Sequence, residues 1–172
     1  MTLFLRGQNK QLSVTLKSSI LSSSKSQQYE QATYYKSQLD SINYITQNYK
    51  GVSKAGVLAT NGTYGAKVYD YYLKKNGIGI LYPDEKSQFE KVHPSIYDPD
   101  YGIKAQSNNI SDRSVSDLFE VARELISKGA EVLILGCTEI PLAITESHLD
   151  GVPVIDASNV LARALVRESR KL

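Results

Sequence analysis

Residues 132–142 read VLILGCTEIPL, and this stretch carries most of the information about the fold. The apolar run at 132–135 ends at turn-forming residues, which is typical of a buried strand in a parallel sheet. Pro141 follows at a position that favours the first turn of a helix. Cys137, the only cysteine in the sequence, is therefore expected between the carboxyl end of a strand and the amino end of a helix. Open α/β sheets bind small ligands at that edge.

A cysteine at this place is expected to be reactive. The free N–H groups and partial positive charge of a helix amino terminus lower the pKa of a thiol and hold an anionic substrate group. A lone cysteine is otherwise often buried as a small, inert side chain. The Gly136-Cys137-Thr138-Glu139 setting favours the reactive alternative, so Cys137 is the candidate catalytic residue.

Outward from this stretch, predicted strands and helices alternate along the chain. Short apolar runs predict further strands at 55–60, 78–82 and 152–155. Helical spacing of apolar residues predicts helices at about 39–49, 65–73, 111–126 and 157–170, the third of which has Ser111 as its cap. A further polar, helical stretch is predicted after Pro83 and a turn at 61–63. This alternation predicts an α/β fold, a three-layer lobe in which helices cover both faces of a parallel sheet.

Two hydroxyl-rich turns are expected to face one ligand. Thr60-Asn61-Gly62-Thr63 follows one predicted strand, and Gly136-Cys137-Thr138-Glu139 follows another. The carboxyl ends of parallel strands lie at the same edge of a sheet, so these turns are predicted to meet there.

Composition limits the classes of function. The net charge of +2 gives no indication of a nucleic-acid or membrane partner. A single cysteine excludes an intrachain disulfide and is typical of the reducing cytoplasm, where we expect the protein. Two histidines and one cysteine, scattered along the chain, do not form a metal-binding motif.

Residues 1–37 differ from the rest of the chain. They are rich in serine and glutamine and poor in bulky aliphatic residues, and their few charged residues are mostly basic. This composition predicts a poorly ordered or degenerate segment that precedes the α/β lobe.

Several stretches resemble the aspartate/glutamate racemase family. Residues 55–63 (AGVLATNGT) and 135–142 (LGCTEIPL) are similar to the two signatures of the carboxyl-terminal half of that family. The segments 96–104 and 152–156 resemble two further family segments. The resemblance extends over residues 39–172.

The resemblance implies a cofactor-independent racemase in which two similar lobes each contribute a cysteine on opposite sides of the substrate α-carbon. Cys137 matches the acid/base of the carboxyl-terminal lobe, and Lys104 matches a lysine near the distal carboxylate. Glu139 matches the position that distinguishes the aspartate-type signature. The substrate-binding positions that the resemblance implies are Thr60, Asn61, Gly62, Thr63, Lys104, Thr138 and Glu139.

The amino-terminal half of the family pattern is missing. The family's other thiol lies in a Cys-Asn-Thr motif, and no such motif occurs here. By resemblance, residues 38–150 form the racemase-like lobe, and 151–172 form a strand and a helix that would pack on the other lobe. Without that lobe, the last helix would expose apolar surface, which predicts self-association, with a homodimer as one form.

The expected function is a racemase acting on aspartate, glutamate or a similar dicarboxylate. Racemisation requires an acid and a base on opposite faces of the α-carbon, and one thiol reaches one face. Thr63, His93 and Lys104 are the candidates for the second group, and loss of the second cysteine predicts impaired activity. Two alternatives remain open: a one-cysteine decarboxylase of the same superfamily, and a non-catalytic remnant that binds a dicarboxylate or a partner protein.

Overall fold

The structure is a computed structural model that describes residues 36, 40, 43–106 and 109–170. The predicted poorly ordered segment, residues 1–37, lies outside the described residues apart from residue 36. Across the described ranges, no helix is both long enough and apolar enough to cross a membrane.

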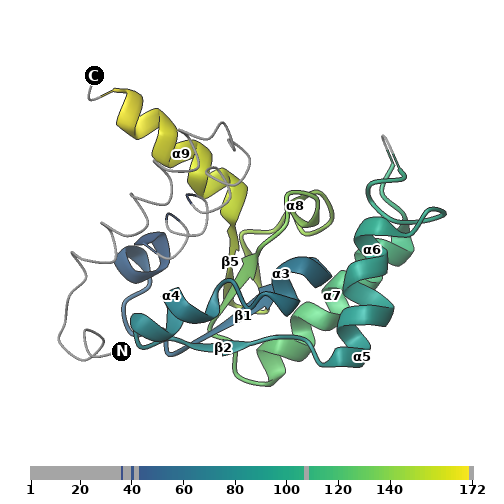
Figure 1. The fold of residues 1–172 in the computed structure, drawn as a ribbon, viewed down its shortest axis with the longest axis horizontal. Helices are drawn as coiled ribbons and strands as arrows, with labels where there is room; N and C mark the ends of the chain where they lie inside the picture. Colours follow the sequence, from purple (N-terminus) through teal and green to yellow (C-terminus); the bar gives the residue numbers. More distant parts are fainter. Residues whose placement is uncertain (1–35, 37–39, 41–42, 107–108, 171–172) are drawn as a thin grey trace.

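A five-stranded sheet forms the centre of the molecule (Figure 1). Its strands are β1 (Lys54–Leu58), β2 (Gly79–Leu81), β3 (Val132–Leu135), β4 (His148–Leu149) and β5 (Val152–Asp156). They lie in the order β2-β1-β3-β5-β4, and the edge strand β4 is antiparallel to its neighbour while β1, β2, β3 and β5 are parallel. The predicted α/β fold with a parallel sheet is confirmed.

Helices cover both faces of the sheet. Residues 43–48 are helical, and the elements that follow are α3 (Asn61–Gly65), α4 (Asp70–Lys75), α5 (Glu85–Ser87), the π-helix η1 (Gln88–Val92), α6 (His93–Tyr97), α7 (Asp112–Ser127), α8 (Ile140–Ala143) and α9 (Ala157–Ser169). Successive side chains of a strand point to opposite faces. Leu133 and Leu135 therefore join a core cluster with residues of α7, η1 and α6, whereas Val132 and Ile134 join a second cluster with Tyr69 and α4.

The helix predicted from Ser111 is α7. The Ser111 hydroxyl accepts a hydrogen bond from the Ser114 N–H at 3.1 Å, which caps the helix as the sequence predicts. Gly129, with φ +95°, follows the other end, in the left-handed region that glycine adopts without strain.

The predicted turn at 61–63 is wrong, because these residues begin α3. The Thr60 side chain caps this short helix by accepting from the Thr63 N–H at 3.5 Å. The helix predicted over 65–73 begins only at Asp70. Lys67 adopts a left-handed φ of +50°, which interrupts the helical path between α3 and α4.

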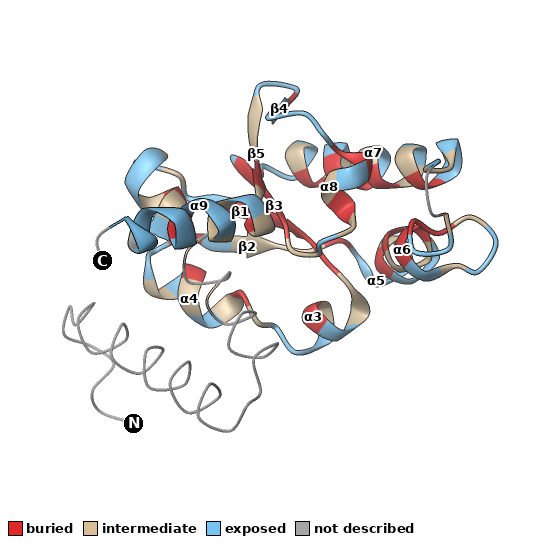
Figure 2. Cartoon of the chain, turned by 90° about the horizontal axis from the view of Figure 1, so that it is seen from above, coloured by how far each residue is buried: buried red, intermediate tan, exposed pale blue. Residues whose placement is uncertain are grey.

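The strand of the segment 151–172 belongs to the central sheet. β5 pairs in parallel with β3, with Val154 opposite Leu133, so the predicted boundary at residue 150 does not separate this strand from the lobe. Helix α9 is different, since most of its surface is exposed (Figure 2). Leu165 and Val166 are 46% and 51% exposed, so this helix retains an uncovered apolar surface.

Candidate functional site

The carboxyl ends of β1 and β3 form the point at which the chain leaves the sheet in opposite directions. β1 is followed by β2 on one side, whereas β3 is followed by β4 and β5 on the other. Ligands bind open α/β sheets at such switch points. Leu58 pairs with Leu135, and the Gly136 N–H donates to the Leu58 carbonyl at 2.8 Å. The structure therefore brings the exits of both strands, and the threonine and cysteine turns that follow them, to one edge.

Gly136 lies at a close approach that leaves little room for a side chain. A Cβ at this position would lie 3.0 Å from Tyr69 Cε2, 3.1 Å from the Tyr69 hydroxyl and 3.3 Å from Ala59 Cβ. Tyr69 is buried and held within the core. The absence of a side chain at residue 136 lets the chain pass against Tyr69 and places Cys137 beside the end of β1.

Cys137 is half-buried and forms a short contact with Glu139. Its Sγ donates to Glu139 Oε2 at 2.8 Å, and the Thr138 hydroxyl donates to the same oxygen at 2.8 Å. Glu139 lies immediately before α8. One carboxylate oxygen of Glu139 thus accepts hydrogen bonds from both the Cys137 thiol and the Thr138 hydroxyl.

The thiol is protonated at neutral pH, so the expectation of a lowered pKa is wrong. Burial raises the pKa of Cys137 to about 12, and the hydrogen bond to Glu139 and the charge of Glu139 act in the same direction. The Glu139 N–H and the Lys104 ammonium favour the thiolate, but their effect is smaller. Helix α8 has four residues, so its partial charge is too small to outweigh burial.

Lys104 binds Glu139 rather than standing free. Its Nζ lies 3.3 Å from Glu139 Oε1 and donates to the Tyr97 hydroxyl at 3.3 Å. Burial alone would raise the pKa of Glu139, but the hydrogen bonds from Cys137, Thr138 and Lys104 outweigh it and lower the pKa. The carboxylate of Glu139 is therefore ionised and held in place from both sides.

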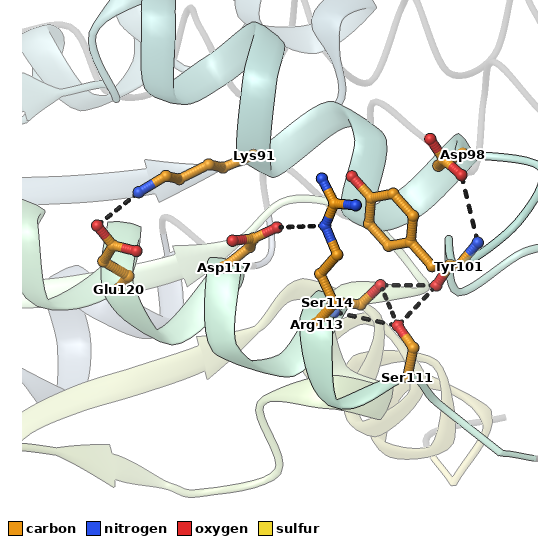
Figure 3. A network of polar contacts seen from close by, with 8 residues as sticks. All are labelled: Lys91, Asp98, Tyr101, Ser111, Arg113, Ser114, Asp117 and Glu120. Atoms are coloured by element: carbon orange, nitrogen blue, oxygen red, sulfur yellow. Dashed lines mark hydrogen bonds and ion pairs between the residues drawn. The ribbon is translucent and has the colours of Figure 1, made fainter.

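The loop that carries Lys104 is anchored by two serines of α7 and its cap. The Ser111 and Ser114 hydroxyls both donate to the Tyr101 carbonyl at 2.8 Å (Figure 3). Gly102 is needed in this loop, because a Cβ there would lie 2.5 Å from the Asp98 nitrogen. These backbone contacts hold Lys104 in reach of Glu139.

The segment Thr60–Thr63 caps and begins α3 directly after β1, at the same edge of the sheet as the cysteine turn. Thr60 Oγ1 lies 3.4 Å from Thr63 Oγ1, and Thr63 is buried within α3. Gly62 is exposed, and a Cβ there would meet only the Thr60 hydroxyl, at 3.8 Å. Asn61 accepts a hydrogen bond through Oδ1 from Gln88 Nε2 at 2.9 Å.

Gln88 is a residue that sequence reasoning missed. It is fully buried, and its Nε2 also donates to the Ala59 carbonyl at 3.0 Å. The available signal was its position four residues before Val92 and eight before Ile96, on a helical face that is otherwise apolar. A polar residue at a core position of this kind indicates a specific hydrogen-bonding role.

A cavity of about 400 Å³ adjoins the cysteine turn at the ends of β3 and β5. Leu135 and Pro141, which flank the turn, contribute to its wall, whereas Cys137 does not line it. Its polar wall residues include Glu146, His148, Asp156, Asn159 and Arg163. The volume is that of a small-molecule site.

Comparison with known sequences identifies the relatives of the chain. A model of the Asp/Glu/hydantoin racemase family matches residues 41–165. An uncharacterized protein of Pectobacterium carotovorum is 34% identical over 116 residues, which are 66% of this chain and 71% of that protein. The broad specificity amino-acid racemase RacX of Bacillus subtilis is 28% identical over 114 residues, which are 66% of this chain and 45% of that enzyme.

Comparison with solved structures leads to the same family. A candidate Asp/Glu racemase from Yersinia pestis has a TM-score of 0.65 at 28% identity, over 77% of this chain and 54% of that one. An aspartate racemase homologue from Pyrococcus horikoshii shares the fold, with a TM-score of 0.61 at 24% identity over 78% and 55% of the two chains. The chain spans about half the length of both structures. Because the family model matches most of its length, the chain belongs to the Asp/Glu/hydantoin racemase family.

Proposed function

We propose that the chain acts on aspartate, glutamate or a similar dicarboxylate by proton transfer between Cys137 and the substrate α-carbon. The main support is the 2.8 Å contact between Cys137 Sγ and Glu139 Oε2, beside the switch point of the sheet. In this proposal the chemistry needs side chains alone and no cofactor.

Cys137 enters the reaction as a thiol because its pKa is raised to about 12. To protonate a substrate carbanion, its S–H bond breaks, the proton forms the new C–H bond, and a thiolate remains. To remove an α-proton, Cys137 must act as the thiolate, so its own proton first leaves to water and the sulfur then accepts the proton from carbon. The Glu139 N–H and the Lys104 charge stabilise the thiolate in both directions.

The substrate carboxylates are proposed to bind between the two turns. The hydroxyls of Thr60, Thr63 and Thr138, the Asn61 amide and the Gly62 backbone supply neutral donors suited to an anion. The Lys104 side chain is 43% exposed, so its ammonium can turn from Glu139 toward a distal carboxylate.

A single thiol favours exchange at one face of the α-carbon over full racemisation. The sequence contains one cysteine, and the chain spans about half of its solved relatives. Thr63, His93 and Lys104 remain the candidates for the second face, and the His93 ring lies 4.9 Å from the Tyr97 ring that contacts Lys104. We therefore propose that racemisation by this chain is slow.

The single cysteine also supports a second candidate function, decarboxylation. In that reaction the bond to a substrate carboxylate breaks, CO₂ leaves with neither electron of the bond, and the carbanion takes the Cys137 proton. The thiolate then regains a proton from water, so one thiol suffices.

Incubation with L-aspartate or L-glutamate in D₂O separates these functions. Racemisation incorporates deuterium and loses optical rotation, whereas one-face exchange incorporates deuterium and keeps the rotation. Decarboxylation of a malonate-type diacid releases CO₂. Binding of the dicarboxylate without any of these reactions would indicate a non-catalytic remnant.

Cys137→Ser should abolish either reaction, since an alcohol is a far weaker acid than a thiol. Ser127→Ala, at the exposed end of α7, is the matched control and should leave the rate unchanged. Turnover by Cys137→Ser equal to that of the parent chain would remove Cys137 from the mechanism.

A further inference from the structure

We infer that Gln88 is a positioning residue, which turns the Asn61 side chain so that its amide N–H₂ group faces the substrate carboxylate. The statement about substrate rests on the proposed function, whereas the orientation of Asn61 can be tested without it.

The contacts of Gln88 determine the orientation of its amide. Its Nε2 lies 3.0 Å from the Ala59 carbonyl oxygen and 2.9 Å from Asn61 Oδ1. The Ala59 carbonyl can only accept a hydrogen bond, so the group that faces it must be the N–H₂ of Gln88. Both amide hydrogens are thereby directed at the exit of β1 and the first residue of α3.

The orientation of Gln88 in turn determines that of Asn61. A donor on Gln88 requires an acceptor opposite, so the Asn61 Oδ1 faces inward and its Nδ2 group faces away from Gln88. With the opposite orientation, two N–H₂ groups would face each other. Asn61 is partly exposed beside the Thr60 and Thr63 hydroxyls, so the turn presents donors to an anionic ligand.

A π-helical turn places Gln88 at this point. The His93 N–H donates to the Gln88 carbonyl, five residues earlier, which is the hydrogen bond of a π-helix. Pro94 has no N–H, so the α-helical bond from residue 94 to residue 90 cannot form. Single π-helical turns occur frequently at functional sites.

Filling of space does not explain a glutamine here. Gln88 shares its helical face with the buried Val92 and Ile96, and among the described residues its Oε1 has no hydrogen-bond partner. An apolar side chain would avoid that buried acceptor, but it would leave the Ala59 carbonyl and Asn61 without their donor. The amide of Gln88 is therefore explained by its hydrogen bonds to the Ala59 carbonyl and to Asn61.

Two variants of nearly equal size test the inference. Gln88→Met removes both donors, and Gln88→Glu places oxygens opposite the Ala59 and Asn61 oxygens, so that Asn61 should turn its carbonyl outward. Nuclear magnetic resonance of the side-chain amides should show slow exchange for the Gln88 N–H₂ group in the parent chain and shifted Asn61 N–H₂ signals in both variants. Unchanged Asn61 signals in both variants would overturn the inference.

The consequence for binding is measured in the exchange assay. We expect KM for the amino acid to rise about tenfold in Gln88→Met, as for one lost hydrogen bond, and further in Gln88→Glu, with kcat changed less than KM. Ser95→Ala is the control. It also removes a fully buried polar group, a hydroxyl that has no hydrogen-bond partner among the described residues, and it should leave KM unchanged.

The outcomes separate the two proposals. Shifted Asn61 signals in a chain that catalyses no exchange with either amino acid would support the orientation by Gln88 and contradict the proposed function. An active chain whose KM is the same in all three variants would reduce Gln88 to a structural residue and overturn its role toward the substrate.

Discussion

At the scale of single residues, the chemistry of Cys137 depends on the groups around its sulfur. Burial and the Glu139 carboxylate keep the proton on the thiol, whereas the Lys104 ammonium and one backbone N–H favour its loss. The same carboxylate is held ionised by Lys104 and Thr138. The proton therefore stays on the sulfur at neutral pH, so Cys137 is better suited to donate a proton to a carbanion than to remove one.

The raised thiol pKa predicts that stability falls at alkaline pH. The pKa of the thiol is about 8.5 in the unfolded chain and about 12 in the folded chain. The thiol therefore stabilises the fold fully below about pH 8.5, and this contribution is lost as the pH rises toward about 12. Between pH 7 and 10 we expect the parent chain to lose about 2 kcal/mol more of its free energy of unfolding than Cys137→Ser. Urea unfolding at both pH values measures this.

The serine variant is also the control for all other groups that titrate in this range, because their contributions cancel in the difference. Parallel pH profiles for the two proteins would show that the thiol is not perturbed in the folded chain.

Gly136→Ala is expected to destabilise the fold. Its Cβ would contact the Tyr69 ring at 3.0 Å and the Ala59 Cβ at 3.3 Å, both inside the core, which costs about 1–3 kcal/mol. Gly65→Ala is the matched control, since nothing lies within 4 Å of its Cβ position, and it should change stability by less than about 0.5 kcal/mol. Thermal unfolding of the two variants should differ accordingly; equal midpoints would contradict the close approach.

At the scale of elements, the loop between α6 and α7 carries Lys104 to Glu139. Its backbone is fixed to α6 at one side, where the Ile103 and Lys104 N–H groups donate to the Ser95 and Ile96 carbonyls at 2.8 and 3.0 Å. On the other side, the Tyr101 carbonyl binds the start of α7 (Figure 3). The cap of one helix therefore also positions a residue of the candidate site.

Ser111→Ala should affect both stability and the site. It removes the cap of α7 and one donor to Tyr101, so we expect a loss of about 1 kcal/mol in the free energy of unfolding. It should also weaken the Lys104–Glu139 pair, which is measurable as a change in the pH dependence of Cys137 alkylation. Ser127→Ala, at the other end of the same helix, bonds only a carbonyl of its own helix and should do neither. Equal effects of the two variants on stability and alkylation would show that the Ser111 cap does not position Lys104.

At the scale of the whole molecule, the described residues form an α/β lobe, and helix α9 is largely exposed within this part of the chain. Helices cover both faces of the sheet. The sheet also contains β5, which the resemblance alone would assign to the part that packs on another lobe. Helix α9 is instead mostly exposed (Figure 2), and Leu165 and Val166 are among its exposed apolar residues by their solvent accessibility. Apolar surface of this kind favours association.

We therefore expect the chain to self-associate through α9, with a homodimer as the simplest form. Leu165→Glu places a charge on that surface and should lower the average mass measured by light scattering. Leu142→Glu changes a side chain of α8 that is exposed to a similar extent, 58% against 46%, and should leave the mass unchanged. A monomeric parent chain at high concentration would contradict the expectation.

The sequence by itself determined the parallel strands β1, β2, β3 and β5 and the long helix α7. The apolar run at 132–135 is β3 without change, residues 152–155 fall within β5, and the Ser111 cap and the apolar spacing after it define α7. These features depend on residues that lie close together in the chain, where alternation and helical periodicity act directly. The meeting of the β1 and β3 exits at one edge also followed, because parallel strands align their carboxyl ends.

Only the tertiary structure decided the electrostatics and the support of the site. Gln88 binds residues 27 and 29 positions earlier in the chain, and Lys104 reaches Glu139 across the whole of α7 and β3. The pKa of Cys137 is raised rather than lowered, because burial by side chains that are distant in the sequence outweighs the partial charge of a short helix. Hydrogen bonds, desolvation and charge act through space, so they are set by packing that local sequence patterns do not contain.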